Sequence, residues 1–489
     1  MKLLRSHGIL LVMLVSALVI WSFQLGNIDP RIDEIITLSA AKESLYSIFF
    51  TINRIYFHIP FYYGLLNAWT RLFGFSYASL RFPSVIFGLL SVVYIYRLSR
   101  LLDGRTAIIS AVLLISNSFF FHIAREARMY SLLVFSTILS TYYFLMYLKK
   151  RTVLGGIKYS LAILLLVFSH YFAPLVLLVH FLYLICSKPP KKVVLYWLAT
   201  GGLGILLISP YIFHYVYQTG SPGESVSRIS VGRDLQYGTK YPNPQPSDLI
   251  RTVTVFLTNI SISRGLFIFC LAAGILLLLP LRHLKKHSPL LMLYFGAITP
   301  LVLVYLISAG NLPGLSNVYN VKYLIISLPF LVMLVSFSLS RLNKYVALCL
   351  IAALVAINAS SVGGGYLPGS HADYHALADF LEKEVGSNAT IVSGTAFYPL
   401  KHYYHGNARM ASINRYSIYD WSEVLGSLDS DEVWIALVAG RKDDIRGYQR
   451  IRRLQEYISE LNASRYRAVL YSGTSFAVYK LEELDQNAE

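Results

Sequence analysis

Residues 7–26 read HGILLVMLVSALVIWSFQLG, a run apolar enough to lie in a lipid bilayer. A helix that spans a membrane needs about 17–25 consecutive apolar residues. No small-residue cleavage site follows the run, so we expect a retained anchor rather than a signal peptide. The next stretch, NIDPRIDEIITLSA at residues 27–40, places Asp29, Asp33 and Glu34 within six residues. Carboxylates set directly beside a membrane span suggest a functional site.

The composition of the whole chain is that of a membrane protein. Of its 489 residues, 55% are hydrophobic and only 14% are charged, whereas soluble domains carry about 25% charged residues. The three cysteines, Cys186, Cys270 and Cys349, all lie within or beside apolar runs. Their spacing predicts neither a disulfide framework nor a zinc site.

Charge divides the chain into two parts. Residues 1–360 contain nine acidic residues against 30 Lys and Arg, whereas residues 361–489 contain 17 acidic against 13 basic residues. The basic residues of the first part occur in short clusters between apolar runs, which is typical of the cytoplasmic loops of membrane proteins. We therefore attribute the sequence pI of about 9.5 to membrane topology and reject nucleic-acid binding.

Placing every basic cluster in the cytoplasm predicts a multi-pass protein of the cell membrane with a cytoplasmic N-terminus. About 11 transmembrane helices result, within a catalytic domain at 1–360 that has outer loops at 26–77 and 215–263. The predicted spans are 8–25, 78–98, 105–121, 130–148, 158–170, 171–187, 193–214, 264–281, 288–309, 321–340 and 345–360. The segment 58–73 is expected to lie along the outer interface, where its Tyr and Trp suit the headgroup region.

The C-terminal segment 361–489 is too polar to enter the membrane. Its patterns predict a small extracytoplasmic α/β domain. Helices are expected at 373–385 and 446–461, and strands at 389–394, 431–439, 466–472 and 475–482. The last two strands are expected to pair with each other because they are separated by two residues.

The carboxylates of the first part gather on the predicted outer side. Of the nine, only Asp103 falls on the cytoplasmic side. Those at 224–248 are interpreted as ordinary loop charges, whereas Asp33 and Glu34 open an amphipathic segment at the outer membrane surface. Neighbouring residues of a helix point about 100° apart, so only one of this pair can face a shared site. A carboxylate at the mouth of a membrane cavity is a candidate general base.

Several segments together resemble a known family, the C-type (GT-C) glycosyltransferases. The resemblance is to the group of the protein O-mannosyltransferases and lipid A aminoarabinose transferases, particularly its predicted membrane-bound mannosyltransferase branch. The resemblance covers residues 20–340 and rests on the order and spacing of six segments and on their shared position on the predicted outer side. The segments are RIDEIITLSA (31–40), HIPFYYGLLNAW (58–69), SLRFPSVIFGLL (79–90), HIAREARMYSLL (122–133), SHYFAPLVLLVHF (169–181) and VKYLIISLPFLV (321–332).

The resemblance implies a membrane enzyme that takes a sugar from a polyprenyl-phosphate carrier. The sugar would be mannose or another hexose or pentose, and the acceptor a hydroxyl of a glycan, lipid or protein. In the family the acidic residue of the first loop is the catalytic base, which implies this role for Asp33, with Glu34 beside it. Glu126 matches the second acidic residue, although relatives often carry that acid nearer the position of Tyr130. One base on the acceptor side suffices for inversion because the leaving group is already a phosphate.

Three cations are candidates for binding the carrier phosphate. Arg125 and Arg128 stand on the predicted outer side, against the positive-inside trend, which favours phosphate or headgroup binding over simple snorkelling. Lys322, followed by Tyr323, stands where relatives often have Arg-Tyr at the outer start of a span. Lys322 is either a phosphate ligand or an ordinary lysine at the membrane interface, and the sequence leaves both readings open.

The remaining candidates each have a structural alternative. His58 matches a histidine of relatives that orients the sugar or, with Glu126, binds a divalent metal; no dense ligand cluster supports the metal, and no other cofactor is predicted. Arg81 either caps its span by binding loop carbonyls or contributes to the site. His170 and Tyr171 occupy an outer turn and are candidates for lining the cavity, and the structural alternative for His170 is a buried, hydrogen-bonded histidine.

The sequence thus predicts a polytopic membrane glycosyltransferase that works at the outer face with a lipid-phosphate sugar donor. Two alternatives from other classes remain: a transporter of lipid-linked glycans, and a non-catalytic membrane protein whose tail binds glycan. Transporters tend to have internal repeats and charges near the bilayer midplane. This chain has its charges at one face and no detectable repeat, which favours the enzyme.

Overall fold

The computed structural model describes residues 2–27, 30, 32–51, 59–220, 244–259, 274, 276–284, 289–310, 318–363, 374–393, 400–401, 403–412, 432–438, 466–472 and 476–483. The chain forms two compact units. The first comprises residues 1–27, 37–222 and 240–363, and the second comprises 28–36, 223–239 and 364–489.

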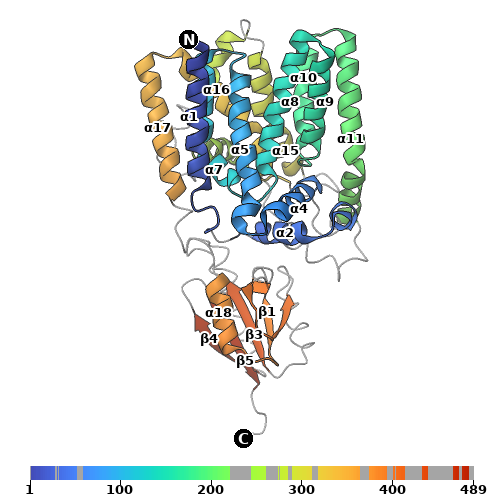
Figure 1. The fold of residues 1–489 in the computed structure, drawn as a ribbon, viewed down its shortest axis with the longest axis vertical. Helices are drawn as coiled ribbons and strands as arrows, with labels where there is room; N and C mark the ends of the chain where they lie inside the picture. Colours follow the sequence, from blue (N-terminus) through green and yellow to red (C-terminus); the bar gives the residue numbers. More distant parts are fainter. Residues whose placement is uncertain are drawn as a thin grey trace. The chain divides into compact units, whose positions relative to one another are not determined.

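The first unit is a helical bundle (Figure 1). Figure 1 shows α1, α5, α8, α9, α11 and α17 running alongside one another, with α4 lying across one end. The helical elements are α1 (Lys2–Ser22), α2 (Ile32–Lys42), η1 (Ser47–Thr51), α4 (Phe61–Phe73), α5 (Tyr77–Ser99), α6 (Gly104–Ser116), α7 (Ser118–Ala124), α8 (Tyr130–Lys150), α9 (Val153–Val167), α10 (Ala173–Ser187), α11 (Lys191–Gly220), α13 (Pro246–Thr258), η2 (Leu279–His283), α15 (Pro289–Ala309), η3 (Tyr323–Ser327), α16 (Leu328–Arg341) and α17 (Lys344–Gly363).

The helices of the first unit are those of a multi-pass membrane protein. Within the described residues, six helices are long and apolar enough to cross a membrane, or seven if the bent pair α6–α7 forms one span. Three shorter apolar helices lie at Gly8–Ser22, Val153–Val167 and Ala173–Ser187. The predicted total of 11 spans stays a prediction, since most of the segment 264–281 lies outside the described residues.

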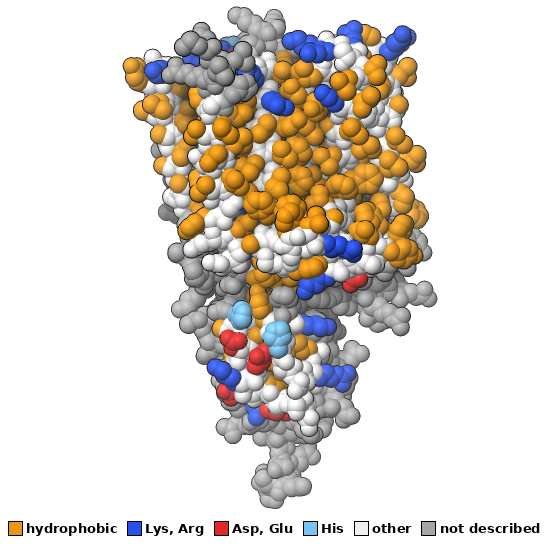
Figure 2. All heavy atoms as spheres, in the orientation of Figure 1, with side chains coloured by type: hydrophobic (Ala, Val, Ile, Leu, Met, Phe, Trp, Pro, Cys, Tyr) orange, Lys and Arg blue, Asp and Glu red, His pale blue; other side chains and the backbone are white. Residues whose placement is uncertain are grey.

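The outer surface of the bundle is apolar. Leu11 of α1, Leu195 of α11 and Leu348 of α17 are all more than 60% exposed. Figure 2 shows a broad band of such side chains on one face of the bundle, with Lys and Arg side chains gathered along one edge. Exposed apolar surface of this extent is unfavourable in water and is stable against lipid chains.

The predicted span 105–121 is broken. Its two parts, α6 and α7, meet at an angle of 66°. Asn117 interrupts the helix because its side chain caps the first turn of α7 and donates a hydrogen bond to the Phe256 carbonyl at 2.7 Å. Beside it, the Ser118 amide donates to Asn358 Oδ1 of α17 at 2.8 Å. Asn358 of α17 thus satisfies a backbone amide that the bend exposes, and a carbonyl of α13 holds the Asn117 side chain.

The amphipathic helix α4 packs on α2 instead of crossing the bundle. Tyr63 and Leu66 of α4 share a buried cluster with Leu38 of α2. The Asn67 side chain donates hydrogen bonds to the backbone carbonyls of Ala41 and Glu43, at 2.9 and 2.8 Å, where α2 ends. These contacts fix the second half of α2 against α4, at the end of the bundle where α4 lies (Figure 1).

The second unit contains a five-stranded sheet of order β2-β1-β3-β5-β4. The strands are β1 (Thr390–Ser393), β2 (Arg409–Ser412), β3 (Val433–Val438), β4 (Tyr466–Ser472) and β5 (Phe476–Glu483). β1 pairs in parallel with β2 and β3, whereas β5 is antiparallel to β3 and β4. Helix α18 (Tyr374–Glu384) packs on the sheet through Leu377 and Leu381. The predicted helix at 446–461 lies outside the described residues.

Candidate functional site

The site is built around the turn between α7 and α8. This turn is tight because the Arg128 amide donates to the Glu126 carbonyl at 2.7 Å and the Ser131 hydroxyl donates to the Ile123 carbonyl at 2.9 Å. Arg125, Glu126 and Arg128 are 6%, 5% and 2% exposed. Charged side chains buried to this degree need partners, and each of the three has them.

Glu126 pairs with Lys322. The Lys322 ammonium donates to both carboxylate oxygens, at 2.9 and 3.3 Å, although the two residues are far apart in the sequence. The same ammonium lies 5.7 Å from the centre of the Tyr130 ring, in a cation–π contact. Lys322 directly precedes η3, so this contact brings the start of η3 to the turn before α8.

Arg128 connects the same turn to α2 and α4. Its Nη1 lies 3.2 Å from the Thr37 hydroxyl and 3.4 Å from the Tyr63 hydroxyl. The Ser84 hydroxyl donates to the Arg128 carbonyl at 3.3 Å. Arg128 therefore joins three elements by its side chain and backbone, and it brings positive charge to the end of the bundle where α4 lies.

The other two arginines bind backbone carbonyls. Arg81 Nη1 donates to the Leu25 carbonyl at 2.7 Å, and Arg125 Nη2 donates to the Phe23 carbonyl at 2.6 Å. Both carbonyls belong to the turn at residues 23–26 that follows α1. These bonds give Arg81 and Arg125 a structural role, and Arg81 makes the loop-carbonyl contact that was one of its two predicted alternatives.

His170 lies in the turn between α9 and α10 and is 4% exposed. Its ring centre lies 5.8 Å from that of Tyr130, 5.2 Å from that of Tyr323 and 5.6 Å from that of Phe172. We call these four rings the aromatic cluster. Burial, together with the charge of Arg128, lowers the pKa of His170 from 6.5 to about 3, so the imidazole is neutral at physiological pH. Tyr171, the next residue and also a predicted site residue, is half-buried.

The predicted acidic pair lies in the first turn of α2. Glu34 is 2% exposed and Asp33 is half-buried. Carboxylates in the first turn are also favoured by the helix dipole, which is a structural reason for their position. Residues 28–36 group with the second unit. Thr37, one helical turn after Asp33, is the residue that contacts Arg128.

The metal prediction is not supported by a ligand cluster. Among the residues that the structure describes, no group of three or more His, Cys, Asp and Glu side chains could hold a metal ion. His58, one of the two predicted ligands, lies outside the described residues. The other, Glu126, has the Lys322 ammonium against both carboxylate oxygens.

The sequence did not identify four residues of this site, Thr37, Tyr63, Tyr130 and Phe172. Three are aromatic, and of these Phe172 directly follows the predicted candidate Tyr171, Tyr130 lies two residues after Arg128, and Tyr63 has no predicted candidate beside it. The sequence does contain a signal for Tyr130. It is an aromatic residue close to the charged Arg128, at the outer end of a predicted span. Thr37 carried no signal, because a threonine in an apolar helix is common.

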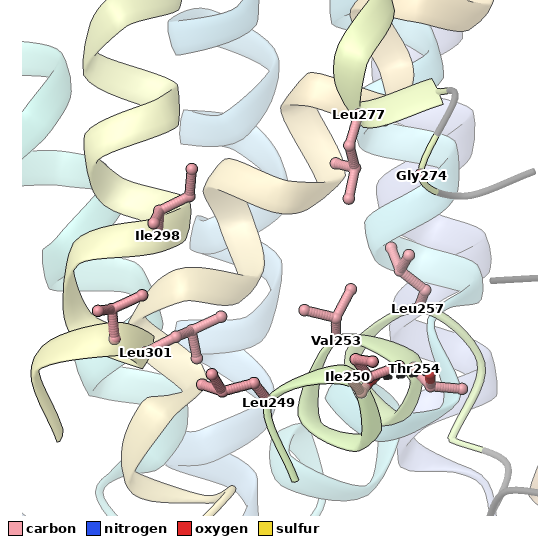
Figure 3. Close-up of a pocket in the computed structure, with 10 residues that line it drawn as sticks. Leu249, Ile250, Val253, Thr254, Leu257, Gly274, Leu277, Ile298 and Leu301 are labelled. Atoms are coloured by element: carbon pink, nitrogen blue, oxygen red, sulfur yellow. Dashed lines mark hydrogen bonds between the residues drawn. The ribbon is translucent and has the colours of Figure 1, made fainter. Parts of the chain in front are cut away.

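A second feature is an apolar cavity of about 260 Å³ between α13 and α15. Figure 3 shows side chains of both helices pointing into it, with Leu277 reaching in from a third segment. Ile250 and Ile298 are more than half exposed, so the cavity opens to the surface. Its described lining residues are Leu249, Ile250, Val253, Thr254, Leu257, Gly274, Leu277, Ile298, Leu301 and Val302.

Tyr319 connects this cavity to the cation site. Its hydroxyl lies 2.7 Å from the Thr252 hydroxyl and donates to the Asp248 carbonyl at 3.0 Å, both on α13. Lys322 follows three residues later and pairs with Glu126. The short segment 319–322 therefore has α13, which lines the apolar cavity, at one end and the buried ion pair at the other.

Comparison with known proteins identifies the relationship. Residues 58–214 match the family model described as dolichyl-phosphate-mannose-protein mannosyltransferase. The chain is related to the GT-C glycosyltransferases of this group. The predicted relationship and the predicted enzyme class, glycosyltransferase, are thereby confirmed. A comparison with curated protein sequences found no match.

Solved structures of GT-C enzymes share the fold. ArnT from Cupriavidus metallidurans in the apo state has a TM-score of 0.61 at 13% identity, covering 97% of this chain and 98% of that chain. The same enzyme bound to undecaprenyl phosphate has a TM-score of 0.58 at 14% identity, with the same coverage. The archaeal oligosaccharyltransferase AglB from Archaeoglobus fulgidus, in complex with an inhibitory peptide and a dolichol-phosphate, has a TM-score of 0.55 at 13% identity, covering 98% of this chain and 75% of that chain. The predicted polytopic GT-C fold is confirmed.

Proposed function

We propose that the protein transfers a sugar, mannose or another hexose or pentose, from a polyprenyl-phosphate carrier to an acceptor hydroxyl at the outer face of the membrane. The observation that carries the proposal is the ion pair between the buried Glu126 and the partly exposed Lys322, connected through Tyr319 to a helix that lines an apolar cavity. A lipid phosphate needs both features, a cation for its head and an apolar surface for its tail. The family match and the lipid phosphates bound to ArnT and AglB add support.

The cations serve the leaving group in this proposal. Attack at the sugar C1 breaks its bond to the phosphate oxygen, and the electron pair leaves with the phosphate. The bridging phosphate of the donor carries about one negative charge and the released lipid phosphate about two, so positive charge stabilises the transition state more than the ground state. Lys322 and Arg128 are proposed to supply that charge, because Arg81 and Arg125 bind carbonyls after α1.

Asp33 is proposed as the general base. It accepts the proton of the acceptor hydroxyl while the hydroxyl oxygen attacks C1 on the face opposite the phosphate, which inverts the anomeric centre. Asp33 is half-buried in the first turn of α2, whereas Glu34 is buried, and the proposal therefore assigns the base to Asp33. The C-terminal domain is proposed to lie on the same, extracytoplasmic side of the membrane.

The experiment is a transfer assay with the purified full chain in nanodiscs. Mass spectrometry of glycans and lipids from cells with and without the protein first identifies the sugar. Asp33→Asn is then expected to lower kcat about 10²–10⁴-fold with little change in donor binding, because general-base catalysis contributes that factor. Ser39→Ala, on an exposed position of the same helix, is the matched control and should keep the parental rate. Parental turnover by Asp33→Asn would end the assignment of the base.

A further inference from the structure

The Nδ1 atom of the His170 imidazole accepts a hydrogen bond within the protein. The Phe172 backbone amide donates a hydrogen bond to His170 Nδ1 at 3.1 Å. A nitrogen that accepts a hydrogen bond carries no proton, so in the neutral ring the proton is on Nε2. The backbone of the turn between α9 and α10 therefore fixes the tautomer and points a donor, Nε2–H, away from the chain that holds it.

That donor has no acceptor within the part of the chain that the structure describes: the interactions of His170 are the bond to Phe172 and its ring contacts. The residue is 4% exposed. Nε2 is not among the described buried polar atoms that lack a hydrogen-bond partner, so this atom keeps accessible surface that a ligand can contact. The ring centres of Tyr130 and Tyr323 lie 5.8 and 5.2 Å from that of His170, so a ligand group that reached Nε2 would approach the aromatic cluster.

The charges around the cluster indicate what kind of group this is. The Lys322 ammonium lies over the Tyr130 ring, at 5.7 Å, and the positive charge of Arg128 acts on the imidazole from the turn before α8. A ligand oxygen between these cations is favoured when it is anionic. A third cation at this place would be repelled by Arg128, whereas a neutral N–H adds a donor without adding charge.

We propose that His170 donates a hydrogen bond through Nε2–H to a phosphate oxygen of the lipid carrier, as a neutral third donor beside Lys322 and Arg128. This inference rests on the proposed function and names a positioning residue for its donor. A hydrogen bond to an anion strengthens as the charge of the anion grows. The bond therefore holds the released lipid phosphate more tightly than the sugar-bearing donor, and it stabilises the departing group.

The test compares three variants for binding of undecaprenyl phosphate alone, measured on the full chain in nanodiscs. His170→Gln keeps a neutral N–H at nearly the reach of Nε2, His170→Asn has an amide that stops short of it, and His170→Phe keeps the ring without a donor. We expect Asn and Phe to weaken binding about 10–150-fold, the range for a lost bond to a charged group, and Gln to restore most of it. Thermal midpoints and gel filtration of each variant establish that it is folded; if His170→Phe fails to fold, the Gln and Asn pair still decides.

Two other results would overturn the inference. Equal losses in the Gln, Asn and Phe variants would assign the ring a packing role only. Normal binding of undecaprenyl phosphate with a raised KM for the sugar-bearing donor would place the bond on the sugar. Binding of the bare lipid phosphate needs no turnover, so a chain that transfers no sugar would refute the proposed function without deciding the role of His170.

The pH profile is a further readout. The titratable and charged groups around His170 are Arg128 and Glu126 of the turn before α8, Tyr130 of α8, and Lys322 and Tyr323 at η3. A neutral donor predicts that wild type and His170→Gln bind the lipid phosphate with parallel profiles between pH 8 and 6. An affinity of the wild type that rises relative to the Gln variant as the pH falls would show a charged imidazole instead.

Discussion

Replacing Lys322 with methionine should be one of the most destabilising single changes in the helical bundle. It removes the ammonium that lies 2.9 Å from a Glu126 oxygen and leaves a carboxylate that is 5% exposed. A buried charge that loses its partner costs about 3–5 kcal/mol. The reverse change, Glu126→Gln, leaves an ammonium whose side chain is 27% exposed and can turn toward water. That change should cost about 1 kcal/mol.

The double variant distinguishes this reasoning from a general loss of contacts. Lys322→Met with Glu126→Gln removes both charges of the pair, so it should regain about 2–3 kcal/mol relative to Lys322→Met alone. Thermal unfolding of the purified protein in detergent, followed by tryptophan fluorescence, ranks the variants. Arg341→Met is the matched control, because Arg341 pairs with Asp103 at 2.8 Å while both remain more than a quarter exposed. Additive effects in the double variant, or a larger loss in Glu126→Gln than in Lys322→Met, would refute the argument.

Three further outcomes are expected. Reporter fusions after residue 150 should report a cytoplasmic location and those after residue 489 an external one, because Lys and Arg mark cytoplasmic loops; a cytoplasmic C-terminus would contradict the proposed orientation. Val253→Trp should fill the apolar cavity and raise the KM for a long-chain donor about 10-fold, since excluding two methylenes costs about 1.6 kcal/mol, while a short-chain analogue serves as control; equal KM changes for both would contradict a tail site. His170→Gln should make stability less sensitive to acid: the folded pKa of about 3 lies below the unfolded 6.5, so the unfolded state takes up the proton first and stability is lost as the pH falls through that window. Parallel losses of Tm in both proteins between pH 7 and pH 4.5 would exclude this contribution.

Hydropathy predicted most of the bundle because a bilayer imposes a length and an apolar composition on each span. It did not predict the break at Asn117. The run AVLLISNSFFFHI, residues 111–123, contains two serines and one asparagine, which a membrane helix tolerates. The bend depends on bonds to Phe256 and Asn358, and contacts between residues so far apart leave no trace in local sequence.

The candidate site shows the same division. The charged turn that contains Glu126, and the later Lys322, were both predicted on the outer side from the positive-inside pattern, but pattern alone could not pair them. Arg125 was predicted to bind phosphate because its charge opposes the positive-inside trend. In the structure its Nη2 donates to the Phe23 carbonyl, and phosphate binding by Arg125 stays a prediction. The sign of a charge is readable in the sequence, and the choice between a ligand and a backbone carbonyl is made only by packing.

The hydrogen bonds of Asn358 fix the position of α17 along the membrane normal. Only 11% of the apolar window of α17 is buried against the rest of the described structure. A helix so exposed to lipid could slide along its axis with little loss of side-chain contact, because lipid chains replace one another freely. Asn358 accepts from the Ser118 amide and donates to the Leu257 carbonyl, and a shift by one turn would leave these groups without partners in a medium that offers none. Asn358, together with Ser361, whose hydroxyl donates to the Thr258 carbonyl at 2.9 Å, thus sets the depth of a helix that apolar packing alone would leave undetermined.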